Sequence, residues 1–335
     1  MAEQAKRVLS GIQPTMDSFH IGNWFGALNQ WVDLQETHEC YYCVVDLHAL
    51  TVNHDPKQIK QRTLASFAQL LALGIDPNRS VVFVQSHLAE HSQLAWVLSC
   101  IAGYGEAARM TQFKDKSQKE GADRATVGLF TYPVLQAADI LLYQPTAVPV
   151  GDDQKQHIEL TRDLAQRFNS TYGQTFTIPQ TMTVVGNSRV LDLQDPTAKM
   201  SKSSPSGAVF LMDSASVISK KIKSAVTDSG REVSYDFEEK PGISNLIGLL
   251  AAATKRPIEE TAEAVSGQGY GSFKQLVADE LVACIEPIRD RTSQLLEDPS
   301  ELTALIARGA TKAGVTARQT LNMTYQRLGL LGPGN

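Results

Sequence analysis

Two lysines and two serines stand close together in the segment Lys199–Ser203, which reads KMSKS. The segment follows Asp195-Pro196, and the residue before a proline disfavours helix, so we expect a mobile polar loop rather than a packed element. Lysine carries a compact charge on a flexible stem, which suits a substrate that gains negative charge during a reaction. Taken alone, a solvated charged surface is the simpler interpretation, so a second motif is needed to choose between the two.

A second polar motif lies far upstream, in Pro14–Asn23, which reads PTMDSFHIGN. Apolar residues then recur at 3-and-4 spacing to about Gln35, which predicts a helix that begins near His20. The first amides and the dipole of such a helix favour anions. His20 and Asn23 can donate hydrogen bonds to phosphate oxygens, and Gly22 would let a base or a ribose approach the backbone. The alternative is that His20 only caps or packs at the start of the helix.

Two common phosphate-binding motifs are absent from the sequence. GxGxxG does not follow the first predicted strand, and GxxxxGK[ST] occurs nowhere in the chain. A chain with this sequence that binds ATP must therefore use another arrangement, and the predicted helix at His20 supplies one.

The elements that must position these motifs alternate between strand and helix in the first half of the chain. Strands are predicted at 7–11, 40–45, 80–85 and 147–150, and helices at 20–35, 56–74 and from about 90. This alternation predicts a Rossmann-like α/β fold with a parallel sheet, whose ligands lie beyond the carboxyl ends of the strands. Gly11–Pro14, Asp46–His48 and Gly151–Gln154 would all lie at that edge.

We expect two domains. An α/β catalytic domain should span residues 1–205, with a charge-rich insertion near 104–128 and the lysine loop at 199–203. After residue 205 the pattern becomes mostly helical, so 206–335 should form a helical domain. The final helix could fold back onto the first domain.

Composition excludes several classes of protein. The chain has 335 residues, 42% of them hydrophobic, and no run of 18 apolar residues, so it should have real cores and no membrane span. The N-terminus lacks the apolar region of a signal peptide, so we expect a cytoplasmic enzyme.

Cys40 and Cys43, two of only four cysteines, should face opposite sides of a strand rather than bind zinc. A net charge of −5 does not exclude a local basic surface, and Lys220–Lys223 is one such cluster.

Together, the two motifs resemble the signatures of the class I aminoacyl-tRNA synthetases, written HIGH and KMSKS in that family. Lys199–Ser203 matches the second signature in full, whereas the first ends in Asn23 instead of histidine. Further segments resemble the bacterial tryptophanyl-tRNA synthetases over nearly the whole chain: 10–15, 45–49, 110–114, 137–143, 151–157, 225–229 and 241–246. In that family the first signature commonly ends in Gly-Asn, so Asn23 agrees with the assignment.

This resemblance implies a tryptophan–tRNA ligase that binds L-tryptophan, ATP with Mg²⁺ and tRNA(Trp), works as a homodimer and needs no structural metal. Its helical domain would bind the tRNA anticodon. The ATP site would contain Gln13, Pro14, Thr15, Gly22, Asn23, Gly151, Asp152, Asp153, Val190, Lys199, Met200, Ser201, Lys202 and Ser203. Charge on the phosphates would be stabilised by His20, Asn23, Lys199, Ser201, Lys202 and, from the insertion, Lys114.

The resemblance places the amino-acid site around Asp139, which would accept a hydrogen bond from the indole N–H, a group that can only donate. The residue lies in the apolar run 137–142, where a buried charge needs a partner, so an ion-paired or helix-starting aspartate is the alternative interpretation. The resemblance adds further residues to this pocket: His48, Tyr132, Gln136, Gln154 and Leu9.

Three other functions compete with this one. Gln136 stands where many bacterial tryptophan enzymes have methionine, and its spacing from Tyr132 and Asp139 also resembles the archaeal type of tyrosyl-tRNA synthetase. That family binds the phenol with a tyrosine near the end of its first strand, where this chain has Leu9, which cannot hydrogen-bond. A nucleotidyltransferase with a related phosphate site is disfavoured by the complete lysine loop and the large helical domain. A non-catalytic paralogue is disfavoured because no signature residue is lost.

Overall fold

The computed structural model describes residues 6–52, 54–110, 126–183 and 190–331. Within these residues, the centre of the molecule is a five-stranded parallel sheet in the order β3-β2-β1-β4-β5. Its strands are β1 (Arg7–Ile12), β2 (Glu39–Val44), β3 (Val81–Val84), β4 (Ala147–Val150) and β5 (Gln180–Thr183). The strand order reverses between β1 and β4, so a crevice beyond their carboxyl ends is the expected ligand site.

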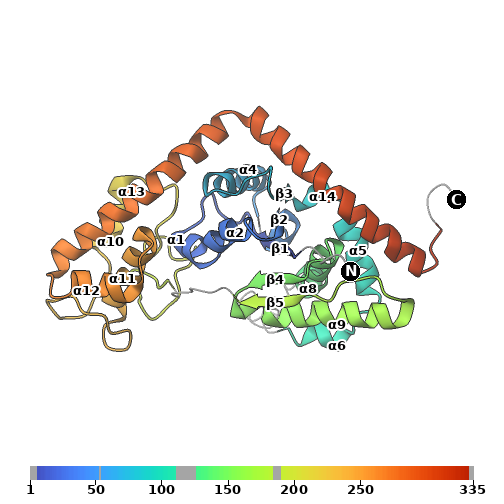
Figure 1. Cartoon of the computed structure of the whole chain (residues 1–335), viewed down its shortest axis with the longest axis horizontal. Helices are drawn as coiled ribbons and strands as arrows, with labels where there is room; N and C mark the ends of the chain where they lie inside the picture. Colours follow the sequence, from blue (N-terminus) through green and yellow to red (C-terminus); the bar gives the residue numbers. More distant parts are fainter. Residues whose placement is uncertain (1–5, 53, 111–125, 184–189, 332–335) are drawn as a thin grey trace.

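Helices cover both faces of this sheet and then make up the second half of the chain (Figure 1). Between the strands lie α1 (Ile21–Asn23), η1 (Trp24–Leu28), α2 (Asn29–Leu34), α3 (Asp46–Ala49), α4 (Pro56–Ala72), η2 (Gln85–His87), α5 (Glu90–Ser99), α6 (Tyr104–Ala108), α8 (Val127–Leu142), η4 (Asp152–Gln154) and α9 (Lys155–Tyr172). After the sheet come α10 (Ala215–Lys223), α11 (Pro241–Thr254), α12 (Ile258–Val265), α13 (Tyr270–Glu297) and α14 (Pro299–Arg327). The predicted Rossmann-like α/β fold followed by helices is confirmed.

The segment predicted as one helix over 20–35 contains a π-helical turn, η1, between α1 and α2. Such a turn inserts one extra residue and often occurs at functional sites. The 3-and-4 spacing of apolar residues does not reveal it, because the flanking turns remain α-helical. The start of the segment is held by the Ile21 N–H, which donates to the Val209 carbonyl at 2.9 Å.

Both faces of β2 are covered, which explains why its sequence is apolar almost throughout. Cys40 and Tyr42 pack in the core on one face of the sheet, and Tyr41 and Cys43 pack in the core on the other. The Tyr42 hydroxyl donates to the Trp31 carbonyl at 2.6 Å. Cys40 and Cys43 are free thiols, and the prediction that they face opposite sides of the strand is confirmed.

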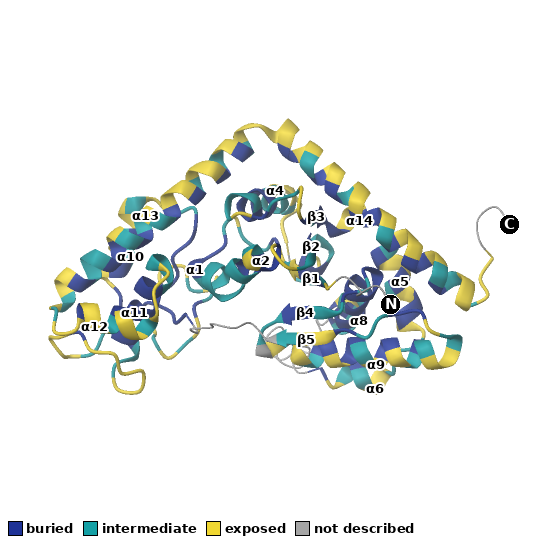
Figure 2. Ribbon diagram, viewed as in Figure 1, coloured by how far each residue is buried: buried dark blue, intermediate teal, exposed yellow. Residues whose placement is uncertain are grey.

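The long helices α13 and α14 form the two arms of an inverted V that lies over one side of the molecule (Figure 1). The first arm packs on α4, α10 and α11, and the second lies against β3 and α5. The buried residues of both helices lie on the side of the ribbon that faces the rest of the molecule (Figure 2). At Gly309 the contact with β3 is so close that a Cβ atom would lie 1.7 Å from the Val82 carbonyl oxygen. Among the described residues, none of the helices has the length and apolar character required to cross a membrane.

Candidate active site

Two adjoining cavities open beyond the carboxyl ends of the strands. The first, of about 830 Å³, lies between the segment at His20 and the lysine loop. The second, of about 640 Å³, extends from the first along α8 to Asp139. Several residues line both cavities: Ile12, Gln13, Asn23, Ala27, Gly151, Asp153 and Lys202. A ligand in one cavity would therefore meet a ligand in the other at these residues.

The first cavity gathers most of the residues predicted for the ATP site. It is lined by Gln13, Thr15, His20, Gly22, Asn23, Gly151, Asp153, Val190, Lys199, Met200, Ser201 and Lys202. Pro14 and Ser203 do not line it: the proline is buried as the middle residue of the turn in which the Thr15 N–H donates to the Gln13 carbonyl, and Ser203 is exposed beside Ser201. Lys114 and the side chain of Asp152 lie outside the described residues.

The lysine loop is anchored more firmly than its polar sequence indicates. Leu191 pairs with Lys199 in an antiparallel bridge, and the Met200 N–H donates to the Val190 carbonyl at 2.9 Å. Met200 itself is 2% exposed and belongs to the core. The Lys202 ammonium donates to the Thr15 hydroxyl, which brings the loop to the first motif. The expected polar loop is therefore present, but Met200 is packed, and the mobility of the loop stays a prediction.

His20 is buried beside the lysine loop. Its backbone N–H donates to Asn23 Oδ1 at 3.2 Å, which leaves the NH₂ group of Asn23 as a donor. Burial, and then the charges of Lys199 and Lys202, lower the pKa of His20 from 6.5 to about 4, so the ring is neutral near pH 7. Its Nδ1 has no hydrogen-bond partner among the described residues.

Gly22 is required by this packing. A Cβ atom at Gly22 would lie 2.9 Å from His20 Nδ1, so any side chain there would displace the histidine ring. The close approach keeps His20, Gly22 and Asn23 together on the wall of the first cavity.

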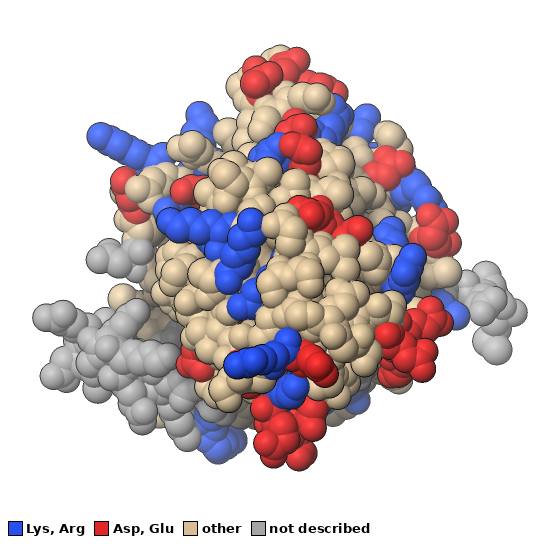
Figure 3. Space-filling model, turned by 90° about the vertical axis from the view of Figure 1, so that its left-hand side faces the viewer, with Lys and Arg blue, Asp and Glu red and all other residues tan. Residues whose placement is uncertain are grey.

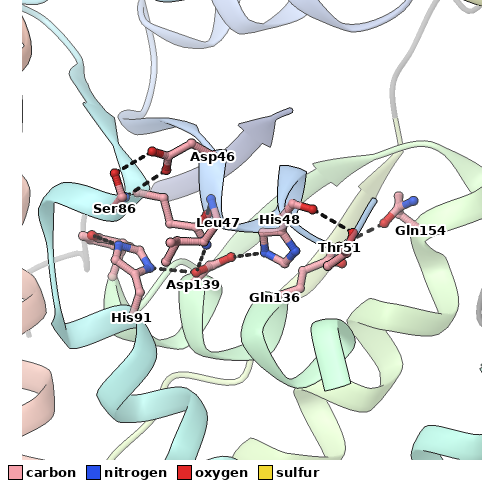
Figure 4. A network of polar contacts seen from close by, with 11 residues as sticks. Asp46, Leu47, His48, Thr51, Ser86, His91, Gln136, Asp139 and Gln154 are labelled. Atoms are coloured by element: carbon pink, nitrogen blue, oxygen red, sulfur yellow. Dashed lines mark hydrogen bonds and ion pairs between the residues drawn. The ribbon is translucent and has the colours of Figure 1, made fainter. Parts of the chain in front are cut away.

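Asp139 lies at the far end of the second cavity with 4% of its surface exposed. Its Oδ1 accepts from Gln85 Nε2 and His91 Nδ1, each at 2.7 Å, and its Oδ2 is 2.6 Å from His48 Nε2. Figure 4 shows the two histidines on opposite sides of the carboxylate. Burial acts to raise the pKa of Asp139, but His48 and then His91 hold it below its usual value, so the carboxylate is ionised.

The donors of Asp139 are themselves oriented by further contacts. Gln85 Oε1 accepts from the Leu47 N–H at 3.1 Å, which turns its NH₂ group toward the carboxylate. His91 Nε2 is 2.9 Å from the Tyr143 hydroxyl. Burial raises the pKa of Tyr143 well above its ordinary value, so the phenol stays protonated. In a neutral His91 ring the phenol then donates to Nε2, and Nδ1–H donates to Asp139.

A second network of hydrogen-bonded polar side chains lies nearer the junction of the two cavities. Gln154 Oε1 accepts from Gln136 Nε2 at 3.3 Å and is 2.9 Å from His157 Nδ1, whose Nε2 is 3.2 Å from the Tyr132 hydroxyl. The structure thus brings together in the second cavity all the residues predicted for the amino-acid site: Leu9, His48, Tyr132, Gln136, Asp139 and Gln154.

Three residues of this site were missed by the sequence analysis. Gln85 directly follows β3, so its place at the carboxyl end of a strand was an available signal. His91 reaches Asp139 only because α5 packs on α8, and His157 reaches Tyr132 because α9 packs on α8. No local pattern in the sequence marks either of these two histidines.

Comparison with known proteins identifies the class that this fold and site define. Residues 1–286 match the model of a family described as tRNA synthetases class I (W and Y). The chain is 55% identical to tryptophan–tRNA ligase 2 of Streptomyces avermitilis, over 99% of each chain. It is 51% identical to the tryptophan–tRNA ligase of Corynebacterium glutamicum, over 98% of this chain and 96% of the other.

Solved structures agree with these relatives. The tryptophanyl-tRNA synthetase of Mycoplasma pneumoniae has a TM-score of 0.87 at 36% identity and covers 98% of this chain and 99% of its own. The enzyme of Campylobacter jejuni, complexed with ADP and tryptophan, has a TM-score of 0.83 at 36% identity, over 97% of this chain and 100% of its own. The chain belongs to the bacterial tryptophanyl-tRNA synthetases.

The lowered pKa of His20 makes a pH-dependent contribution to stability. Between pH 6.5 and about 4 the unfolded chain binds a proton at this histidine and the folded chain does not, so the free energy of unfolding falls as the pH falls. From pH 7.5 to pH 5 this loss is about 2 kcal/mol. Urea unfolding of the wild type and of His20→Gln at both pH values should show a loss smaller by that amount in the variant. Equal losses in the two proteins would contradict the account of His20.

Proposed function

We propose that the chain activates L-tryptophan with ATP and transfers the tryptophanyl group to tRNA(Trp). The observation that carries this proposal is the ionised, buried carboxylate of Asp139 in the second cavity, which shares lining residues with the first. Family membership, and the neighbour that binds ADP and tryptophan, give the enzyme class and support both small substrates.

Recognition of the indole rests on the acceptor capacity of Asp139. A carboxylate offers about four lone-pair positions, and Gln85, His48 and His91 occupy three of them. The remaining position is available to one donor, which we assign to the indole N–H. His48 was predicted as part of the amino-acid pocket, and its contact with Asp139 leads us to propose that it positions the Asp139 carboxylate.

The other end of the amino acid would lie at the junction of the cavities. Tyr132, Gln136 and Gln154 line the second cavity near residues that it shares with the first, so we assign them to the ammonium and carboxylate groups. Leu9 supplies an apolar wall and no hydrogen bond, which favours an indole over a phenol at this position. The tyrosine alternative is therefore not adopted.

ATP would occupy the first cavity, with adenine beside Val190 and the phosphates between His20 and the lysine loop. The neutral His20, the Asn23 NH₂ group, Ser201 and the two lysines would then face the phosphates, and Lys114 could join them from the insertion. Among the described residues there is no group of three or more His, Cys, Asp or Glu side chains that could hold a metal. We infer that Mg²⁺ arrives with ATP and is bound mainly by phosphate oxygens and water.

The chemistry requires positioning and charge stabilisation more than proton transfer. The tryptophan carboxylate is already ionised, so it attacks the α-phosphorus without a general base, and the bond to the bridging oxygen of pyrophosphate breaks. Lys199 and Lys202 would stabilise the charge that develops on the phosphates; loss of one such group typically costs about 3 kcal/mol in the barrier. The 2′-hydroxyl of the terminal ribose of tRNA then attacks the acyl carbon and AMP leaves, as the class resemblance implies.

We assign tRNA binding to the helical half, 206–335, and activation of the amino acid to residues 1–205. Both steps would take place in the cytoplasm, where the charged tRNA is used. In α10, Lys220 and Lys223 are exposed, whereas Lys221 pairs with Asp213 at 2.7 Å. Figure 3 views this end of the molecule and shows Lys and Arg side chains spread over it among acidic ones. Such a surface can bind phosphates despite the negative net charge.

A homodimer is supported by an apolar surface on the α/β half. Trp96, Tyr104 and Val127 are 72%, 79% and 77% exposed, and they lie on α5, α6 and α8, of which α5 and α6 each pack on α8. Large exposed apolar side chains that gather on adjacent elements mark interaction sites. Because most soluble oligomers are symmetric, we propose that a second copy of the chain covers this surface with the same residues.

Tryptophan-dependent exchange of pyrophosphate into ATP tests the function. We expect exchange with tryptophan and none with tyrosine. In Asp139→Asn, kcat/KM for tryptophan should fall by about 100-fold, because an amide turns an NH₂ group toward donors that need an acceptor. Asp163→Asn, which changes an exposed carboxylate on α9, is the matched control and should leave the rate unchanged. Exchange driven by tyrosine alone would refute the proposed specificity for tryptophan. If no amino acid drove exchange, the proposed enzymatic activity would be refuted.

Light scattering tests the dimer. The wild type should have twice the chain mass of 36.6 kDa, and Trp96→Glu should shift the population toward monomer because it places a charge in the proposed interface. Tyr235→Glu, at a 45% exposed aromatic in the helical half, is the control and should remain dimeric. A monomeric wild type would remove the dimer from the proposal.

A further inference from the structure

The segment 241–246 begins α11, outside both cavities, and has no role in the site described so far. Its Asn245 is 6% exposed and lies among the buried apolar residues Ile243, Leu246 and Ile247 of the same helix. The side chain bonds twice to one residue of the catalytic half: Oδ1 accepts from the Leu191 N–H at 2.9 Å, and Nδ2 donates to the Leu191 carbonyl at 3.2 Å. A buried side chain of α11, in the helical half of the chain, thus holds both backbone polar groups of one residue in the catalytic half.

Leu191 is part of the base of the lysine loop. It forms the antiparallel bridge with Lys199, and its neighbours continue the pairing, since the Met200 N–H donates to Val190 and the Asp192 N–H donates to Ala198, both at 2.9 Å. Residues 190–192 and 198–200 therefore form a short two-stranded ladder. Val190 and Lys199, on the two sides of this ladder, both line the first cavity.

The bond pattern requires an asparagine. The amide presents one acceptor and one donor at the spacing of a backbone N–H and C=O, and both of its partners are buried. A leucine at this position would leave two buried backbone groups unpaired, and an aspartate would set an oxygen against the Leu191 carbonyl. Two backbone bonds of Leu193 also join the segment to the helical half: its carbonyl accepts from the Val226 N–H at 2.7 Å, and its N–H donates to the Gly207 carbonyl at 2.8 Å. Neither bond holds Leu191.

We propose that Asn245 is a positioning residue for amino-acid activation: by fixing Leu191, it sets the ladder so that Val190 and the lysines lie correctly around ATP. Asn245 does not line either cavity, so it acts through the ladder and not on the substrate. The inference rests on the proposed function, because it assigns the first cavity to ATP.

Kinetics with ATP varied at saturating tryptophan test this role. In Asn245→Asp and Asn245→Ala, kcat/KM for ATP in pyrophosphate exchange should fall tenfold or more, since a displacement of about 1 Å at a reacting centre can cost about 100-fold. Direct binding of tryptophan, measured by calorimetry without ATP, should stay within about twofold, because the second cavity does not contact the ladder; that binding also shows that the variants are folded.

Asn169→Ala is the matched control for loss of stability alone. Asn169 holds a loop in the same way, donating to the Phe176 carbonyl at 2.8 Å and accepting from the Phe176 N–H at 2.9 Å, but it lies in α9 away from both cavities. This variant should lower the free energy of unfolding and leave the ATP kinetics unchanged. If the Asn245 variants behave like this control, Asn245 is only structural and the proposal is overturned.

Trypsin gives a second measurement that a merely structural role would not move. Lys199 and Lys202 are exposed in the loop, and cleavage after them can be followed by mass spectrometry. A non-hydrolysable ATP analogue should slow this cleavage in the wild type and in Asn169→Ala, and should protect Asn245→Asp much less at the same concentration. Equal protection of all three proteins would contradict the proposal. A wild type without tryptophan-dependent exchange would instead refute the proposed function.

Discussion

A buried carboxylate that must remain charged is the constraint on which the site depends. Asp139 is almost fully removed from water, and an uncompensated charge there would cost several kcal/mol. Its three donors come from different elements: His48 from α3 after β2, Gln85 from the turn after β3, and His91 from α5. The parallel strand order and the packing of α5 on α8 are what bring them to one carboxylate. The same packing fixes which lone pair is left for a ligand.

The first cavity, which we assign to ATP, is lined by positively charged side chains, whereas the second is built around the negative charge of Asp139. At the first cavity the protein gathers positive charge and keeps His20 neutral, because burial and then repulsion by the charges of Lys199 and Lys202 lower the pKa of the ring. An anionic ligand would relieve that repulsion, so binding of phosphates and protonation of His20 are coupled. The lysines are held near the cavity by the packed Met200 and by the ladder at Leu191, and the two cavities meet at Asn23 and Lys202.

Features encoded in short stretches of sequence could be predicted, and features that depend on packing could not. Alternating strand and helix patterns predicted the parallel sheet, and strand ends predicted where Asp46–His48 and Gly151–Gln154 would lie. Asp139 stood out as a charge in an apolar helix. His91 and Asn245 did not, because their partners lie 48 and 54 residues away and become neighbours only when α5 and α11 dock. The burial of Met200 was hidden for the same reason, whereas the π-helical turn after Asn23 was hidden because the turns on either side of it remain α-helical.

The most direct test of this account compares tryptophan with an analogue that carries sulfur in place of the indole N–H. The analogue keeps the shape and the apolar surface of the side chain but cannot donate to Asp139. A site built around a buried acceptor rejects a ligand that lacks the matching donor, so kcat/KM in pyrophosphate exchange should be lower for the analogue by at least about 100-fold. Equal values of kcat/KM for the two amino acids would show that Asp139 does not recognise the indole N–H, and would contradict the central claim that this carboxylate selects tryptophan.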